Sequence, residues 1–216
     1  GRAFNENIQL ELNDANKPLP GLIVHKAKII QGNLHTGDNL TLEVNRHTRG
    51  DIALNHSATH LLHAALKEVL GEHIKQAGSL VASNRLRFDY THFSPLTDKE
   101  KFRIESRVNE KVRENIQVST QEMDIDSAIK EGAMALFGEK YGETVRVVNI
   151  PGFSKELCGG THITATGDIG LFRITSEGGI ASGVRRIEAV TGATAYDTIR
   201  AEQESLSAIR GLLKAP

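Results

Sequence analysis

The stretch LNHSATHLLHAALKEVL, residues 54–70, sets the architecture of most of this chain. Its apolar residues recur three and four positions apart, which predicts an amphipathic helix with one face in a hydrophobic core. Residues four apart are neighbours on a helix surface, so His56 and His60 are expected to lie side by side. The helix therefore presents two imidazoles at one place beside the core.

The elements expected around that helix are both strands and helices. A hairpin is predicted over 80–90, where Ser83-Asn84 is turn-like and Leu86, Phe88 and Tyr90 alternate. The remaining predictions are a charged amphipathic helix over 98–115, a strand over 118–123, a short helix over 126–134, a strand over 144–150 and glycine-rich β structure over 167–192. Residues 51–192 are therefore expected to form a mixed α/β domain with an antiparallel sheet.

The two ends of the chain differ from this middle part. Residues 1–50 contain three short apolar segments, over 8–12, 22–30 and 40–44, separated by Gly, Pro and turn residues, and this pattern predicts a small β-barrel. The segment 17–21 is expected to end the first strand. Residues 193–216 are predicted to form a third segment, because 192–213 reads as a projecting helix whose remaining faces are polar. The expected fold class is α+β.

Composition limits the possible functions. The 216 residues carry a formal net charge of −1, which argues against a strongly basic DNA-coating protein but allows local nucleic-acid-binding patches. Cys158 is the only cysteine, so no intramolecular disulfide forms, which fits a reducing cytoplasm. No apolar run long enough for a membrane span and no signal peptide is present. Because the chain starts with Gly1, we interpret it as a piece of a longer protein.

A second group of metal-binding residue types lies far along the chain, in Cys158-Gly159-Gly160-Thr161-His162. The two glycines permit a tight loop whose backbone approaches a ligand closely. Together with His56 and His60, Cys158 and His162 would give three nitrogen donors and one sulfur donor, a set that suits zinc.

Other interpretations of these residues remain open. The two helix histidines could share a face by chance, and a lone cysteine is often a packed small hydrophobe. Cys158 could also be a nucleophile activated by neighbouring histidines, but that interpretation leaves the helix pair unexplained. His63 lies one turn beyond His60, and we interpret it as a packing residue or a partner of a ligand, since the loop already supplies enough donors.

A set of four protein ligands leaves two roles for the metal, structural or catalytic. A closed four-ligand shell is typical of structural zinc, whereas catalytic zinc keeps a position open for water or substrate. The metal could therefore polarise substrate or lower the pKa of a water. Alternatively, it could shape a pocket and hold the substrate in place.

Several blocks of the sequence are similar to one known family. They are HSATHLLH at 56–63, QAGS at 76–79, LRFD at 86–89, GAMALFGEKY at 132–141, ELCGGTH at 156–162, GDIGLFRI at 167–174 and GVRRIEAVTG at 183–192. In this order they resemble the editing domain of the alanyl-tRNA synthetases, in its bacterial form. The resemblance runs from the N-terminal strands through Gly192.

The resemblance implies a hydrolase, an aminoacyl-tRNA deacylase. Its substrate would be the acceptor end of tRNA(Ala) mischarged with serine or glycine. A pocket for alanine rejects glycine or serine by only about 1–3 kcal/mol, so a second sieve is needed. The resemblance also implies Zn²⁺ held by His56, His60, Cys158 and His162. It further implies a cytoplasmic protein, the remaining synthetase chain as partner, no membrane partner, and a last helix that begins the oligomerisation segment.

The resemblance places Gln76 and Thr59 at the reaction site. Gln76 would bind substrate or orient water, and the alternative is a surface glutamine that caps a helix end. Thr59 would hydrogen-bond the serine hydroxyl, and the alternative is a bond to a helix carbonyl. A site that binds serine's hydroxyl spares alanine, because alanine leaves the polar groups unpaired.

Backbone and basic residues complete the expected substrate and tRNA contacts. Gly159 and Gly160 would approach the substrate, and the glycine-rich loop 176–183 could cradle phosphates. Arg185 and Arg186 follow that loop, and neighbours in a strand point to opposite faces. Only one of them is therefore expected to face the pocket or the tRNA. The alternative is that one arginine forms a surface ion pair and the other lies at the edge of the core.

Two other functions remain possible. A structural zinc module could bind tRNA without independent catalysis, which a closed metal shell without an adjacent cavity would favour. A metal-dependent amidase unrelated to tRNA would instead be indicated by activity on small amides.

Overall fold

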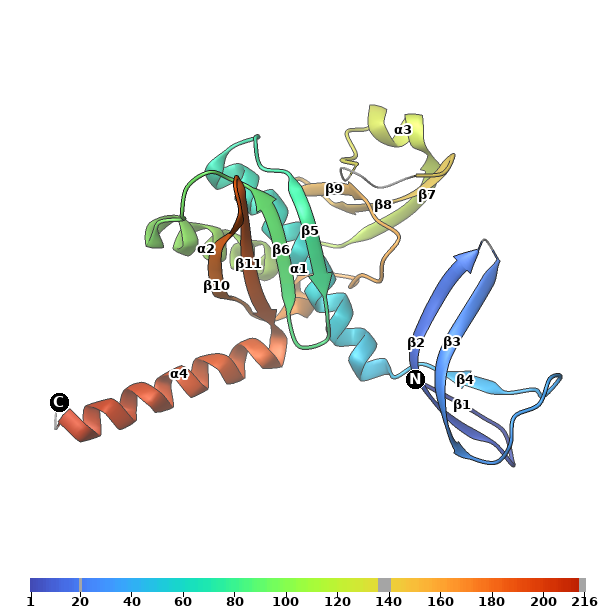
Figure 1. Ribbon diagram of the computed structural model, residues 1–216. Coiled ribbons are helices and arrows are strands. Elements are labelled where there is room, and N and C mark those ends of the chain that lie inside the picture. Colours follow the sequence, from blue (N-terminus) through green and yellow to red (C-terminus); the bar gives the residue numbers. More distant parts are fainter. Residues whose placement is uncertain (20, 136–140, 214–216) are drawn as a thin grey trace. The chain divides into compact units, whose positions relative to one another are not determined.

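The computed structural model describes residues 1–19, 21–135 and 141–213 (Figure 1). Its contacts divide the chain into two units, Gly1–Arg49 and Gly50–Pro216. The division into segments 1–50, 51–192 and 193–216 remains a prediction. Within the similar block 132–141, residues 136–140 lie outside the described part of the chain. Among the described residues, no helix combines the length and apolarity that crossing a membrane requires.

The first unit contains one four-stranded antiparallel sheet. Its strands are β1 (Arg2–Phe4), β2 (Gln9–Leu19), β3 (Leu22–Gln31) and β4 (Thr41–Glu43), in the order β3-β2-β1-β4. The sequence pattern missed β1 because three residues are too few to show alternation. Within the described residues, β3 and β4 each pair on one side only, so the sheet is open and does not close into the expected barrel.

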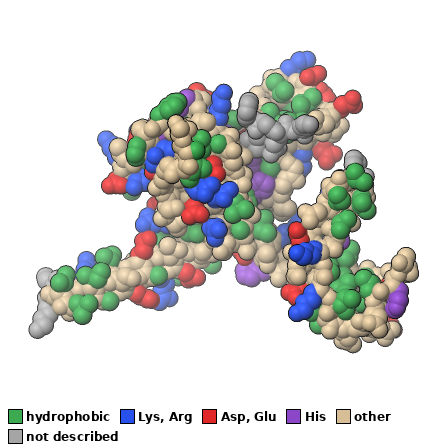
Figure 2. Space-filling model, in the orientation of Figure 1, with side chains coloured by type: hydrophobic (Ala, Val, Ile, Leu, Met, Phe, Trp, Pro, Cys, Tyr) green, Lys and Arg blue, Asp and Glu red, His purple; other side chains and the backbone are tan. Residues whose placement is uncertain are grey.

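The strand β2 is longer than expected and continues through Pro18 to Leu19, where it pairs with Leu22. On its other side, β1 pairs only with residues 9–11 of β2. Proline lacks an N–H, and it is tolerated here because that side of β2 has no neighbour at this point. Hydrophobic side chains are exposed along the β2–β3 hairpin (Figure 2), among them Leu22 and Ile23.

The second unit is built around helix α1 (Arg46–Leu70) and a four-stranded antiparallel sheet. The sheet has the order β10-β11-β6-β5 and consists of β5 (Gln76–Val81), β6 (Leu86–Thr91), β10 (Phe172–Ala181) and β11 (Val184–Thr191). Helix α2 (Asp98–Arg113) packs against the same core. These elements confirm the expected α+β class.

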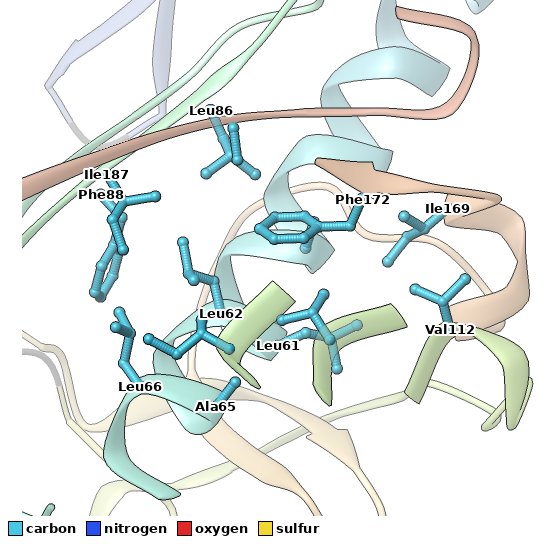
Figure 3. Packing of buried hydrophobic residues seen from close by; sticks show 14 of the residues in the cluster. Leu61, Leu62, Ala65, Leu66, Leu86, Phe88, Val112, Ile169, Phe172 and Ile187 are labelled. Atoms are coloured by element: carbon cyan, nitrogen blue, oxygen red, sulfur yellow. The ribbon is translucent and has the colours of Figure 1, made fainter. Parts of the chain in front are cut away.

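The hydrophobic core explains why the residues of α1 form a helix here. Leu61, Leu62 and Leu66 are completely buried, and they face Phe88 of β6 and Phe172 of β10 (Figure 3). Burying a side chain of this size contributes about 1.5–3 kcal/mol. The helix begins eight residues earlier than its apolar pattern, because its first two turns are polar and carry no periodic signal.

Side-chain hydrogen bonds cap the first turns of α1 and α2. The side chain of Asn45 accepts a hydrogen bond from the N–H of Thr48 at the start of α1, at 3.0 Å. At the start of α2, Thr97 and Glu100 form a capping box, each bonding the other's backbone N–H. The helix then ends near the predicted position.

A second, three-stranded antiparallel sheet carries the loop with Cys158. It consists of β7 (Ser119–Asp124), β8 (Thr144–Ile150) and β9 (Ser154–Leu157), and helix α3 (Ile125–Lys130) follows β7. The strand β9 was not predicted, since four residues between two turns carry little periodic signal. A 3₁₀ turn (Thr166–Ile169) leads on to β10. Helix α4 (Gly192–Leu213) ends the described chain, and Ala195 is its only buried side chain.

Candidate metal centre

Helix α1 and the loop after β9 bring four donor side chains together. They are His56, His60, Cys158 and His162, called here the His/Cys cluster, and their ligand atoms all lie within 4.8 Å of one another. The Sγ atom of Cys158 lies 3.4 Å from Nε2 of His56 and 3.3 Å from Nε2 of His162. The structure thus assembles the four residues that the sequence singled out.

The donor set can be tested against a metal ion. Tetrahedral zinc with its usual bond lengths places ligand atoms about 3.4–3.8 Å apart, close to the sulfur–nitrogen distances in the cluster. The Nε2 atom of His60 is buried and has no hydrogen-bond partner in the described part of the chain, which is costly for a polar atom unless something else binds it. The His/Cys cluster could therefore hold a metal ion.

The position of Cys158 follows from the sheet before it. Its N–H donates to the carbonyl of Arg146 on β8 at 2.9 Å, and the guanidinium of Arg146 donates back to the carbonyls of Cys158 and Gly160. Gly160 lies so close to the ring of His56 that a Cβ atom would overlap it. The loop therefore reaches the helix only with glycine at 160.

Ser57 orients the second ligand of the loop. Its Oγ lies 3.1 Å from Nδ1 of His162 and accepts a hydrogen bond from the N–H of Ile163 at 3.2 Å. With Nδ1 bonded to Ser57, Nε2 of His162 is the atom that faces Cys158. Ser57 was not singled out from the sequence, although it lies between the two helix histidines.

The environment of Cys158 favours the thiolate. Burial alone would raise its pKa, but hydrogen bonds from His162 and His56 outweigh burial and lower the pKa to about 3. Burial lowers the pKa of His162 and so keeps its imidazole neutral. A thiolate and neutral imidazoles are the forms that bind metals.

Glu156 belongs to the hydrogen-bond network of this cluster, and the sequence alone did not single it out. It is 2% exposed, and its Oε2 lies 2.7 Å from Nδ1 of His60 while its Oε1 lies 3.1 Å from Nδ1 of His63. Burial opposes its ionisation, yet the two imidazoles hold the pKa of Glu156 well below its usual range. Burial likewise disfavours charge on His60, but Glu156 outweighs it and raises the pKa of His60 to about 10.

A cavity of about 260 Å³ lies next to this network. Its lining includes His63, Lys67, Lys75, Gln76 and Met134. Gln76 begins β5, is half-buried, and its amide nitrogen lies 3.5 Å from Ser79 Oγ. The structure thus places Gln76 at a cavity that a chain of hydrogen bonds through His63 and Glu156 links to His60.

The other expected site residues have identified partners. The hydroxyl of Thr59 is buried and donates to the carbonyl of Asn55 at 2.9 Å, so the bond to a helix carbonyl is present. Arg185 forms two hydrogen bonds with Glu177, and Arg186 forms two with Asp89. Substrate or tRNA contact by these residues remains a prediction.

Part of the sequence matches a known family of domains. The family described as "Threonyl and Alanyl tRNA synthetase second additional domain" matches residues 145–188. The match covers β8 through most of β11 and includes Cys158 and His162.

Over nearly its whole length, the chain is similar to alanine–tRNA ligases. The chain is 50% identical over 214 residues to the alanine–tRNA ligases of Staphylococcus aureus strains Newman, USA300 and COL. This region is 99% of the chain but 24% of each relative, so the chain spans about a quarter of their length. The chain is therefore similar to one segment of alanine–tRNA ligases, and the resemblance found in the sequence is confirmed.

Proposed function

We propose that this chain is the editing segment of an alanyl-tRNA synthetase and hydrolyses the ester of tRNA(Ala) mischarged with serine or glycine. The observation that carries the proposal is the His/Cys cluster together with a cavity that Gln76 and His63 line, the two being linked by the hydrogen bonds of Glu156 to His60 and His63. Similarity to alanine–tRNA ligases supports the choice of tRNA. The partners would be the acceptor end of tRNA(Ala) and the rest of the synthetase, in the cytoplasm.

We propose zinc as the metal of the His/Cys cluster. Three imidazoles and a thiolate are the donors of many zinc sites. When bound, zinc would supply a positive charge that polarises the ester and favours attack on it. Four protein donors also suit an organising role, in which the metal holds α1 and the loop in place.

The chain's own residues would bind and select the aminoacyl group. At about 260 Å³, the cavity is smaller than the ~300–1,000 Å³ of drug-sized ligand sites, which suits a small amino acid. The amide of Gln76 can donate to a carbonyl or accept from a hydroxyl. Serine satisfies such a group and alanine leaves it unpaired, so this contact would separate the serine ester from correctly charged tRNA. Glycine also lacks the hydroxyl, so the site would have to separate it from alanine by the size of the methyl group.

A second candidate function is a structural zinc module that binds tRNA without catalysis. A specific observation favours it: all four donors lie close enough to close the metal shell. The cavity that His63 and Gln76 line counts against it, because a purely structural site needs no cavity.

Deacylation of serine-charged tRNA(Ala) tests the proposal, with glycine-charged tRNA as second substrate and alanine-charged tRNA as control. We expect hydrolysis of the serine and glycine esters, none of the alanine ester, and loss of activity in Cys158→Ala. Zinc binding without cleavage of either ester, by this chain and by the full-length enzyme, would support the structural module instead.

A further inference from the structure

One buried carboxylate connects the His/Cys cluster with the cavity. The two oxygens of Glu156 each bond the Nδ1 atom of a different histidine of α1, His60 and His63. Both imidazoles are buried, and the Nε2 atom of each has no hydrogen-bond partner among the described residues. The two rings are therefore held in the same way, and each leaves one nitrogen unused.

The hydrogen bonds determine which nitrogen carries the proton. An ionised carboxylate only accepts hydrogen bonds, so each Nδ1 must be the N–H donor. A metal binds only the neutral imidazole, which keeps the proton on Nδ1 and leaves the other nitrogen with a free lone pair. For His60 this nitrogen is the ligand atom of the His/Cys cluster, whereas His63 lines the cavity.

We propose that Glu156 is a positioning residue that fixes both histidines as Nδ1–H tautomers. It directs the Nε2 lone pair of His60 to the metal and holds the buried ring of His63, a residue that lines the cavity, in the same tautomer. The inference rests on the proposed function for the identity of the metal.

The substitution Glu156→Gln distinguishes the positioning role of Glu156 from a role in packing alone. Glutamine has nearly the same shape as glutamate, but its amide offers one accepting oxygen and one donating nitrogen. It can hold at most one of the two imidazoles as the Nδ1–H tautomer, and because the amide is uncharged it holds that ring less strongly than a carboxylate does, so the orientation of His60 is weakened in either case. Ser154 gives a matched control, since its hydroxyl also bonds Glu156, at 3.2 Å, without touching either histidine in the described contacts.

The first test is zinc affinity, measured by competition with a chromophoric chelator. Loss of a partner that orients a metal ligand typically weakens binding 10–100-fold. We expect a loss of that order in Glu156→Gln and less than about threefold in Ser154→Ala. Circular dichroism of the zinc-free proteins shows whether both variants fold. Equal zinc affinity of a folded Glu156→Gln and the parent would overturn the proposal.

The second test needs no variant. Long-range ¹H–¹⁵N spectra of the imidazole rings identify the protonated nitrogen of each histidine in the zinc-loaded protein. We expect the proton on Nδ1 in both His60 and His63. A proton on Nε2 of His63 would overturn the proposal even if Glu156→Gln did not fold.

Failure of this inference can be told apart from failure of the proposed function. Zinc affinity and the imidazole spectra require no tRNA. A protein that shows both expected results but cleaves no ester would support Glu156 as a positioning residue and contradict editing. A protein that edits, but whose Glu156→Gln variant binds zinc like the parent, would support editing and contradict the positioning role of Glu156.

Discussion

Gly160 of the loop after β9 lies against the imidazole ring of His56 on α1, and no side chain fits between them. Its neighbour Gly159 has open space where a Cβ would lie. Neither has the positive φ that glycine alone adopts easily, so the requirement at 160 is for space. This contact brings Cys158 and His162 within reach of the helix histidines.

Gly160→Ala is expected to weaken zinc binding at least tenfold. The added methyl group overlaps the His56 ring, so the ring or the whole loop must shift and the four donors separate. Chelator competition measures the effect, and Gly159→Ala is the matched control with an expected affinity close to that of the parent. Equal affinities of the two variants would contradict this account of the loop.

Zinc is expected to stabilise the folded chain. A ligand at about 100 times its dissociation constant adds about 2.7 kcal/mol, which for a chain of this size raises Tm by roughly 5–10 °C. Differential scanning calorimetry with zinc and with excess chelator measures the shift. Cys158→Ala should show little or no shift, and an unchanged shift in that variant would exclude Cys158 as a ligand.

The two neighbouring arginines of β11 are expected to differ in their effect on stability. Arg185 pairs with the buried Glu177, and its loss in Arg185→Met leaves that carboxylate uncompensated, a cost of about 3 kcal/mol. Arg186→Met should cost less stability, because Asp89 retains a second ion-pair partner: Nε of Arg87 lies 3.8 Å from its Oδ1. Urea unfolding of the two variants gives the comparison, and a larger loss for Arg186→Met would reverse this ranking.

Tyr90 is expected to make stability fall at alkaline pH. Burial raises its pKa, and the neighbouring Glu177 raises it further. Below about pH 10 the hydroxyl is protonated in both the folded and the unfolded chain. Above that pH the unfolded chain loses the proton first, so the free energy of unfolding falls as pH rises.

Urea unfolding at neutral pH and above about pH 10 measures this dependence. Tyr90→Phe removes the titrating group and should flatten the alkaline decline, although it also loses the hydrogen bond to Glu177 at neutral pH. An equally steep decline in the variant would show that other groups are responsible.

Local patterns predicted most of the helices and strands. The strand β8 and the helix α4 lie at the predicted positions, and α2 ends within two residues of its expected end. Two short strands, β1 and β9, were missed because their three or four residues show no clear period. The strand β4 is equally short, but alternation over 40–44 indicated it. The sheet predicted at the N-terminus is present, but the strand pairings of the described residues do not close it into a barrel, since closure depends on pairing between distant strands.

The amino-acid sequence was sufficient to select the four members of the His/Cys cluster, because the spacing of two histidines on a helix and of Cys158 and His162 on a glycine loop is a local property. Only the tertiary structure revealed that Glu156 bonds His60 and His63, and that the cavity beside them is lined by Gln76. These partners lie more than 90 residues apart in the chain. Their contacts depend on how β9 packs against α1, and no periodicity within either segment encodes that packing.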